Sequence, residues 1–250
     1  MNFNSALQYK GWWIMLLSVT FAVVTDPLGT VLLFSRFGSV GEWSVARIIM
    51  VYAMAVTSFG LAESFLRGFD YFPGHSIRTG NFDRMLLRPA PLFTQIAASY
   101  FHIHRLARPA SGICAICWSF YAQGTIITPT VVAVVVCGLA GGFILYSGAF
   151  IFTSGVSFFT IKALDWIYLF TNASYQVTRC PVPYMPNALK NVFTFFMPML
   201  LVSYYPASVA CGWGEDTWKG WVALPAGILF LFASWLIWQT GLRHYKSTGS

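Results

Sequence analysis

The chain has 250 residues, of which 57% are hydrophobic, 18% are aromatic and only 9% are charged. Soluble domains use charged residues at about 25%, so this composition excludes an ordinary soluble domain and predicts a membrane protein with several spans. The net charge of +7 would favour nucleic-acid binding in a soluble protein. Here the basic residues cluster between apolar segments, which favours membrane topology and no nucleic-acid partner.

A helix that crosses a membrane needs about 20 mostly apolar residues. Six segments meet this requirement, and they predict an all-α membrane protein with six transmembrane helices in a single domain over residues 1–250. In chain order the predicted spans are 12–35, 46–66, 107–125, 130–158, 190–209 and 220–242.

An even number of spans places both termini on the same side of the membrane. If that side is the cytoplasm, twelve of the fifteen Lys and Arg residues are cytoplasmic, and only Arg36, Arg47 and Lys219 are not. The excess of basic residues on the cytoplasmic side of membrane proteins therefore predicts that both termini are cytoplasmic.

Two carboxylates lie in or near the predicted spans. Asp26, directly before Pro27, falls in the middle of the first span, where a charge is costly unless it faces a partner or water. It is a candidate for the translocation pathway, while a helix break or a span that ends early and re-enters are the alternatives. Glu63 is the second candidate, although interfacial solvation beside Arg67 explains it without a role in transport.

The segment 67–106, between the second and third predicted spans, carries much of the polar chemistry. Between residues 67 and 108 there are six arginines and two aspartates. Asn81 or its neighbour is expected to cap a short amphipathic helix over 82–87, and Arg88 before Pro89 is expected to end it. The expected apolar side of this helix consists of Phe82, Met85 and Leu86.

Residues 160–187 show no clear span. Charged and polar residues mix with aromatic ones here, and three prolines follow, at positions 181, 183 and 186. An amphipathic helix at the interface and a re-entrant hairpin are both compatible with this pattern.

The chain lacks the common motifs for catalysis and nucleotide binding. It contains no G-x-x-x-x-G-K-[ST] loop, no G-x-G-x-x-G, no G-x-S-x-G and no H-E-x-x-H. Cys114 and Cys117 form a C-x-x-C inside a predicted span, where packing residues are expected rather than a metal or redox pair. The sequence therefore predicts no ATPase motif, no metal site and no cofactor in this chain, and it does not support an enzyme.

The run from Ile77 to Pro91, IRTGNFDRMLLRPAP, resembles the permease subunits of bacterial type-2 ABC transporters (ABC-2). GEWS at 41–44, YYPA at 204–207 and RHYKSTGS at 243–250 extend the similarity over most of the chain. Met85 stands where that family more often has leucine. The motif is matched at Ile77, Arg78, Gly80, Phe82, Asp83, Leu86, Leu87, Arg88 and Pro89.

This resemblance implies a six-span permease in the cytoplasmic membrane of a bacterium. It implies a second permease, identical or a sister chain, and two copies of a separate ATPase subunit that binds ATP and Mg²⁺. Members of the family mostly export drugs, cationic toxicants, peptides or other amphipathic compounds. The cytoplasmic segment between spans two and three would contain the coupling helix, with Arg78, Gly80, Phe82, Asp83, Arg84, Leu86, Leu87, Arg88 and Pro89 as the ATPase-coupling residues.

Two other classes of function stay open at this stage. An ATP-independent channel or secondary carrier is the main alternative, although proton-driven carriers usually need more ionisable residues in their spans than this chain has. An integral-membrane enzyme or scaffold is the third hypothesis.

Overall fold

The computed structural model describes most of the chain beyond residue 42. Its secondary structure is helical there, and the described residues contain no β-strand, which confirms the predicted all-α class. The described residues are 43–77, 80–101, 103–160, 176–178, 180–214 and 216–245, with the isolated positions 14, 17, 18, 21, 25, 28, 29, 31 and 32.

Among the residues that the structure describes, three helices are long and apolar enough to cross a membrane. They are α3 (Val45–Phe72), α7 (Pro129–Ser157) and α12 (Ala223–His244). Local signals fix where two of them begin, because Ser44 and Thr128 occupy the N-cap positions and accept hydrogen bonds from backbone amides in the first turn. These apolar helices coincide with the segments 46–66, 130–158 and 220–242, for which spans were predicted.

α3 extends six residues beyond the predicted end of its span, to Phe72. The span was predicted to end at residue 66, where the apolar stretch stops and Arg67 and Asp70 follow. Both side chains are buried and ion-paired with each other, so the charges do not end the helix.

α6 (Ala107–Gln123) occupies the third predicted span and ends at Gly124, which has a positive φ of 63°. Its 17 residues rise about 26 Å, somewhat less than the hydrocarbon core of about 30 Å. The helix is therefore at the lower limit of a membrane crossing.

The predicted fifth span, 190–209, is not one straight helix. It consists of α9 (Asn187–Asn191), the π-helix η4 (Val192–Phe196), α10 (Met199–Val202) and α11 (Tyr204–Ala210), with a bend of 73° between η4 and α10. Pro198 stands at the bend and disfavours helical geometry in Met197, whose backbone is extended (φ −128°, ψ 87°).

The first predicted span, 12–35, lies largely outside the described residues, although its described positions are helical. Most of 160–187 also lies outside them; within it are helical positions 176 and 177 and the short 3-10 helix η3 (Val182–Tyr184). A total of six spans therefore stays a prediction.

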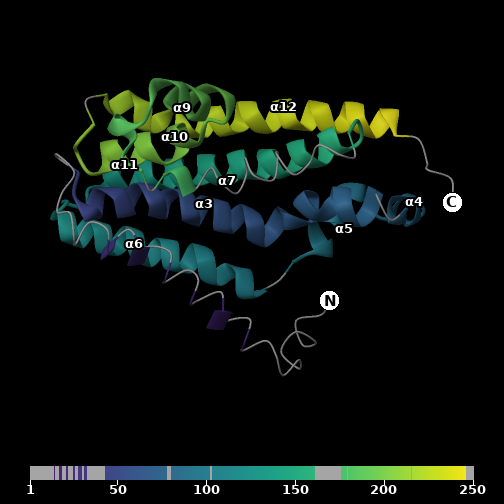
Figure 1. Ribbon diagram of the computed structural model, residues 1–250, viewed down its shortest axis with the longest axis horizontal. Helices are drawn as coiled ribbons and strands as arrows, with labels where there is room; N and C mark the ends of the chain where they lie inside the picture. The colour runs from purple at the N-terminus through teal and green to yellow at the C-terminus, as the bar shows by residue number, and fades with distance from the viewer. Residues whose placement is uncertain are drawn as a thin grey trace.

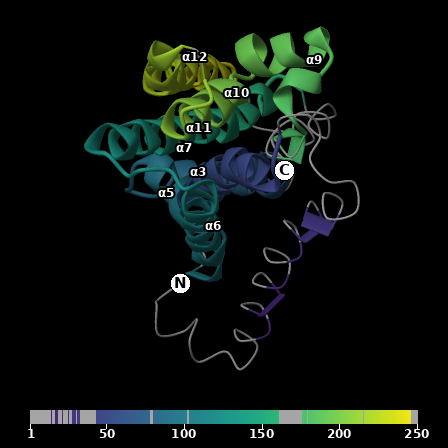
Figure 2. The same cartoon turned by 90° about the vertical axis from the view of Figure 1, so that its left-hand side faces the viewer.

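The long helices lie side by side with α3 and α7 in the middle (Figure 1). α12 packs on α7, and α6 packs on the opposite side of α3 (Figure 2). Every residue of α3 from Ile48 to Gly60 is buried, as expected of a helix that is apolar on all sides. α3 is the central helix of the described bundle.

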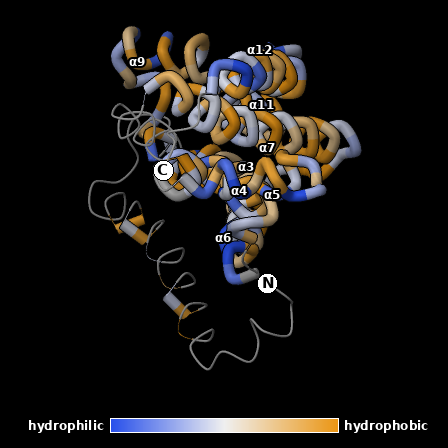
Figure 3. Tube along the Cα trace, turned by 90° about the vertical axis from the view of Figure 1, so that its right-hand side faces the viewer, coloured by the Kyte–Doolittle hydropathy of each residue, from blue (hydrophilic) through white to orange (hydrophobic). Residues whose placement is uncertain are grey.

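Shorter elements lie at one end of this bundle, here called the α4 end, where α3, α7 and α12 finish and α6 begins (Figure 1). They are the π-helix η1 (Pro73–Ile77), α4 (Asn81–Leu86), α5 (Leu92–Ser99) and the 3-10 helix η2 (Ile103–Leu106). Hydrophilic residues are visible in α4 and near the start of α6 in Figure 3.

Glycines allow two helix pairs to approach closely. On the α7–α12 contact, a β-carbon at Gly141 would overlap the carbonyl of Ala223, and one at Gly155 would lie 2.9 Å from the backbone nitrogen of Trp238. On the α3–α5 contact, a β-carbon at Gly68 would overlap the carbonyl of Ile96. Small residues hold membrane helices together in this way because they bring the backbones into contact.

We expect Gly68→Ala to destabilise the protein, because the obstacle is a backbone carbonyl of α5 rather than a movable side chain. Overpacking of this kind costs about 1–3 kcal/mol. The measurement is the unfolding temperature of the detergent-solubilised chain, with Ala98→Ser on the exposed side of α5 as the control. Equal unfolding temperatures for Gly68→Ala and the native chain would show that α5 is not held against α3 as described.

Candidate functional site

The α4 segment begins at a glycine in a backbone conformation that most other residues rarely adopt. Gly80 is the N-cap of α4 and has φ 70° and ψ 2°, in the left-handed region that favours glycine. The predicted cap, Asn81 or its neighbour, is thus the neighbour Gly80, while Asn81 is the first helical residue and no side chain caps the helix. The helix covers 81–86 rather than 82–87.

A tight turn ends α4, as the proline pattern predicts. The amide of Arg88 donates to the carbonyl of Met85, and Pro91 is the N-cap of the next helix, α5. Gln95 of α5 fixes this turn, because its Nε2 donates to the carbonyl oxygens of Met85 (3.1 Å) and Ala90 (2.8 Å). Sequence analysis missed Gln95, whose only signal is an amide a few residues after two prolines.

On its inward side, α4 is attached to the ends of three long helices. The ring of Phe82 is fully buried and lies against the rings of Phe72 (5.2 Å between centroids), Phe158 (5.6 Å) and Tyr245 (4.6 Å). Each such aromatic pair contributes about 0.5–1.5 kcal/mol beyond its buried area. We call the set the aromatic cluster, and its members are Phe69, Phe72, Phe82, Phe158, Trp238 and Tyr245.

A hydrogen bond adds to this attachment. The hydroxyl of Tyr245, directly after α12, donates to Oδ1 of Asp83 in α4 at 3.1 Å. Burial, and then the hydrogen bond to Asp83, raise the pKa of Tyr245, so its hydroxyl keeps the proton that it donates. Asp83 thus acts within the chain, and its partner is 162 residues away in the sequence.

The outward side of α4 exposes two leucines. Leu86 is 52% exposed and Leu87 is 85% exposed, and Arg84, Arg88 and Pro89 are exposed beside them. The expected apolar side of the helix needs correction, because Phe82 is buried and Met85 is partly buried against the core of the same chain. Of the expected three, Leu86 remains accessible, and Leu87 joins it.

Glu63, a candidate for the translocation pathway, is surrounded by arginines. Its Oε1 lies 3.3 Å from Nη1 of Arg105 and 3.7 Å from Nη1 of Arg67, and Arg108 donates to its Oε2. The Glu63 side chain is 12% exposed. The sequence indicated Arg67 alone, because the other two arginines follow 42 and 45 residues later.

This ion cluster joins α3 to the start of α6. Arg67 also pairs with Asp70 at 3.4 Å, and its guanidinium lies 5.0 Å from the ring centre of Tyr71. Buried charges are costly unless they are paired, and removing one member of a buried pair is strongly destabilising. The contacts of Glu63 are those of a residue that holds two helices together.

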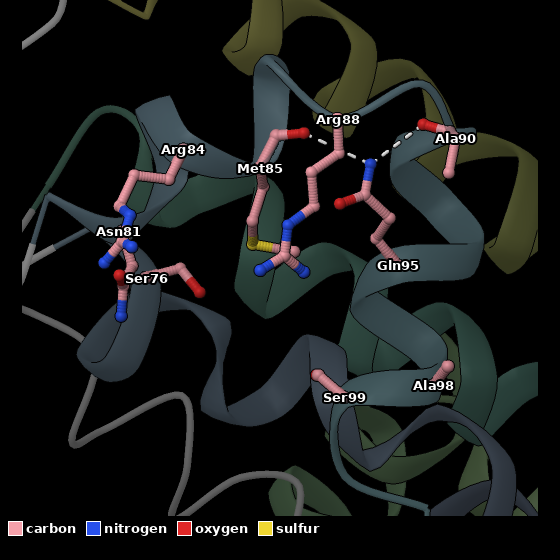
Figure 4. Close-up of a pocket in the computed structure, with 9 residues that line it drawn as sticks. All are labelled: Ser76, Asn81, Arg84, Met85, Arg88, Ala90, Gln95, Ala98 and Ser99. Atoms are coloured by element: carbon pink, nitrogen blue, oxygen red, sulfur yellow. Dashed lines mark hydrogen bonds between the residues drawn. The ribbon is translucent and has the colours of Figure 1, made fainter. Parts of the chain in front are cut away.

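A cavity of about 520 Å³ lies between η1, α4 and α5 (Figure 4). In Figure 4 the guanidinium of Arg88 points into this cavity between Met85 and Gln95. The lining residues are Ser76, Asn81, Arg84, Met85, Arg88, Ala90, Gln95, Ala98 and Ser99.

Two predicted site residues, Asp26 and Arg78, lie outside the described residues. Their roles stay predictions. Within the part of the chain that the structure describes, no group of three or more His, Cys, Asp or Glu residues is placed to hold a metal ion.

Comparison with known protein families gives a match. The family model of the ABC-2 family transporter protein matches residues 20–249, which is most of the chain. Proteins of this family are membrane components of transporters and work with a separate ATPase. The comparisons with curated proteins and with solved structures give no match. The chain belongs to the ABC-2 transporter family, and the resemblance noted in its sequence is confirmed.

Proposed function

We propose that the chain is the permease subunit of an ATP-driven exporter and that α4 is its coupling helix. The observation that carries this proposal is the two-sided character of α4. Phe82 attaches the helix to its own chain, while Leu86 and Leu87 stay exposed at the end of the bundle. Two ATPase subunits, which bind ATP and Mg²⁺, would act on two permease chains, identical or sister chains.

The exposed leucines would supply the binding energy for the ATPase. Burying a leucine side chain contributes about 1.5–3 kcal/mol, so this pair is large enough to anchor a docking contact. Arg84 and Arg88 add positive charge beside it. Such charge favours encounter with a partner surface of negative potential, and it contributes more to the association rate than to affinity.

The aromatic cluster would transmit the motion of α4. Its rings come from the ends of α3, α7 and α12, so a displacement of Phe82 acts on all three helices together. Closure of the ATPase pair would then move these ends as one body and switch a central pathway between inward and outward access. Rigid-body movement of packed elements is a common form of such transitions.

The charge distribution supports a cytoplasmic position for the α4 end. Arg105, Arg108 and Arg243 lie there in addition to Arg84 in α4 and Arg88 in the turn after it. Basic residues accumulate on the cytoplasmic side. We therefore place α4 and both termini in the cytoplasm and the chain in the inner membrane of a bacterium.

The cargo that fits this chain best is an amphipathic or cationic compound. Phe195 and Phe196, beside the bend at Pro198, are 81% and 62% exposed and offer aromatic faces. Such faces attract cations as well as apolar groups. Asp26 remains a candidate for the pathway, whereas the arginine contacts of Glu63 favour a structural role. Transport driven by an ion gradient without any ATPase would favour the alternative, an ATP-independent channel or secondary carrier.

The first test replaces the exposed leucines by Leu86→Asp with Leu87→Asp. We expect the affinity for the ATPase to fall at least about 100-fold, because about 3 kcal/mol or more of apolar burial is lost. The measurement is the amount of ATPase that co-purifies with the tagged chain from its native membrane. Ile126→Asp, at an exposed position of the opposite end, is the control. Capture of equal amounts by the double variant and the native chain would refute the docking role of α4.

The second test separates docking from transmission. Phe82→Ala leaves the leucines in place and removes the ring that contacts the aromatic cluster. We expect the variant to capture the ATPase but to lose most cargo transport in reconstituted vesicles, with Phe82→Leu giving an intermediate rate. Transport at the native rate by a folded Phe82→Ala chain would show that the aromatic cluster does not transmit the motion.

The third test concerns Glu63. If Glu63 has a structural role, Glu63→Gln should lower the free energy of unfolding by up to about 3 kcal/mol, because it removes the carboxylate that pairs with the surrounding arginines. Adding Arg105→Gln should restore part of the loss, because it removes one of these arginines. Thermal unfolding of the single and double variants measures both effects. A variant with native stability but altered selectivity for cationic cargo would instead place Glu63 in the translocation pathway.

A further inference from the structure

The cavity between η1, α4 and α5 is lined by hydrogen-bond donors of the kind that hold phosphate. Arg84 and Arg88 contribute two guanidinium groups, and Ser76, Asn81 and Ser99 add neutral polar groups. None of the described lining residues is acidic, and the ion pairs found among the described residues do not include Arg84 or Arg88. Guanidinium groups bind phosphate oxygens through two parallel hydrogen bonds.

The walls of the cavity are held in place. Gln95 ties the turn after α4 to α5 through the carbonyls of Met85 and Ala90. On the other side, α5 is in backbone contact with α3 at Gly68. In Figure 4 the guanidinium of Arg88 points into the space between Met85 and Gln95, while the turn at Ala90 lies at its edge.

Aromatic side chains of the kind found at membrane surfaces lie next to the cavity. Tyr100 follows the lining residue Ser99 directly, and its ring lies 5.0 Å from that of Tyr71 at the end of α3. Phe101 lies 6.0 Å from Phe65 in the same way. Tyr71 and Phe101 are 38% and 42% exposed. Amphipathic aromatic rings such as tyrosine concentrate where the hydrocarbon core meets the lipid headgroups.

A volume of about 520 Å³ is sufficient for a phosphodiester headgroup. The cytoplasmic leaflet, where we place this end of the chain, is rich in anionic lipids, and basic segments beside a transmembrane helix attract them. The level of the cavity, beside Tyr100 and at the end of α3, favours a lipid over an acidic segment of a protein partner.

We propose that this cavity binds the phosphate of an anionic phospholipid headgroup, held by Arg84 and Arg88, with the headgroup between α4 and α5. This inference goes beyond the transport function, since lipid binding does not require the ATPase or the cargo. Leu86 and Leu87 would anchor the ATPase, while Arg84 and Arg88 would hold the lipid. One phosphodiester neutralises one of their two positive charges, so the pair would still attract a partner surface of negative potential.

The test uses the full-length purified chain without its ATPase. The chain is exchanged into mixed micelles with equal amounts of phosphatidylglycerol and phosphatidylcholine, and the lipids that stay bound are counted by native mass spectrometry. The variants are Arg84→Gln with Arg88→Gln, and Arg243→Gln as a control, because Arg243 is an exposed arginine of the α4 end that does not line the cavity. Thermal unfolding of each variant verifies that it is folded.

We expect the native chain and Arg243→Gln to retain phosphatidylglycerol in preference to phosphatidylcholine. In the double variant the ratio of bound phosphatidylglycerol to bound phosphatidylcholine should be about tenfold lower. An equal preference in all three chains, or an equal loss in Arg243→Gln, would overturn the site. Titration with inorganic phosphate alone is a separate arm, and binding of free phosphate without any preference for the anionic lipid would overturn the lipid as its source. A second arm measures how much ATPase co-purifies with each variant from its native membrane. Unchanged lipid retention together with lost capture of the ATPase would assign the cavity to the protein partner and overturn the proposal.

Discussion

The contact between Phe82 and the aromatic cluster is the interaction on which the architecture of the α4 end depends. A helix of six residues has little stability of its own, and α4 keeps its position because its ring is buried among rings from three long helices. The hydrogen bond from Tyr245 to Asp83 strengthens the same attachment. Without this contact, the exposed leucines would have no fixed relation to the three long helices.

Other contacts at this end also hold the short elements in fixed positions, and they differ in chemical type. Gly68 brings α5 into backbone contact with α3, and Gln95 of α5 fixes the turn that follows α4. Glu63 joins the start of α6 to α3 through arginines that lie far from it in the sequence. Steric contact, hydrogen bonding and ion pairing therefore all connect the short elements to α3, the buried central helix.

The features that could be predicted from the sequence are those that depend on residues close together in the chain. Apolar stretches predicted α3, α7 and α12, the proline after Arg88 predicted the turn, and the motif around Gly80 indicated the family. Prediction failed where the outcome depends on residues that are distant in the chain. The inward direction of Phe82 depends on Phe158 and Tyr245, and the burial of Glu63 depends on Arg105 and Arg108. The bend in the predicted fifth span is an intermediate case. The sequence shows Pro198, but it does not show that the chain bends there by 73°.

The measurement that tests the central claim most directly is a distance between α4 and α12 in the working transporter. One spin label is placed at Ala90→Cys, in the turn that Gln95 ties to the end of α4, and the other at Thr240→Cys in α12. In a chain whose native cysteines are replaced, they report this distance with the ATPase in its nucleotide-free state and with a bound non-hydrolysable ATP analogue. The account predicts the same distance in both states, while the distance between the Thr240 positions of the two permease chains changes. A change between Ala90 and Thr240, with the distance between the two Thr240 positions constant, would contradict it, because α4 would then move independently of the helices.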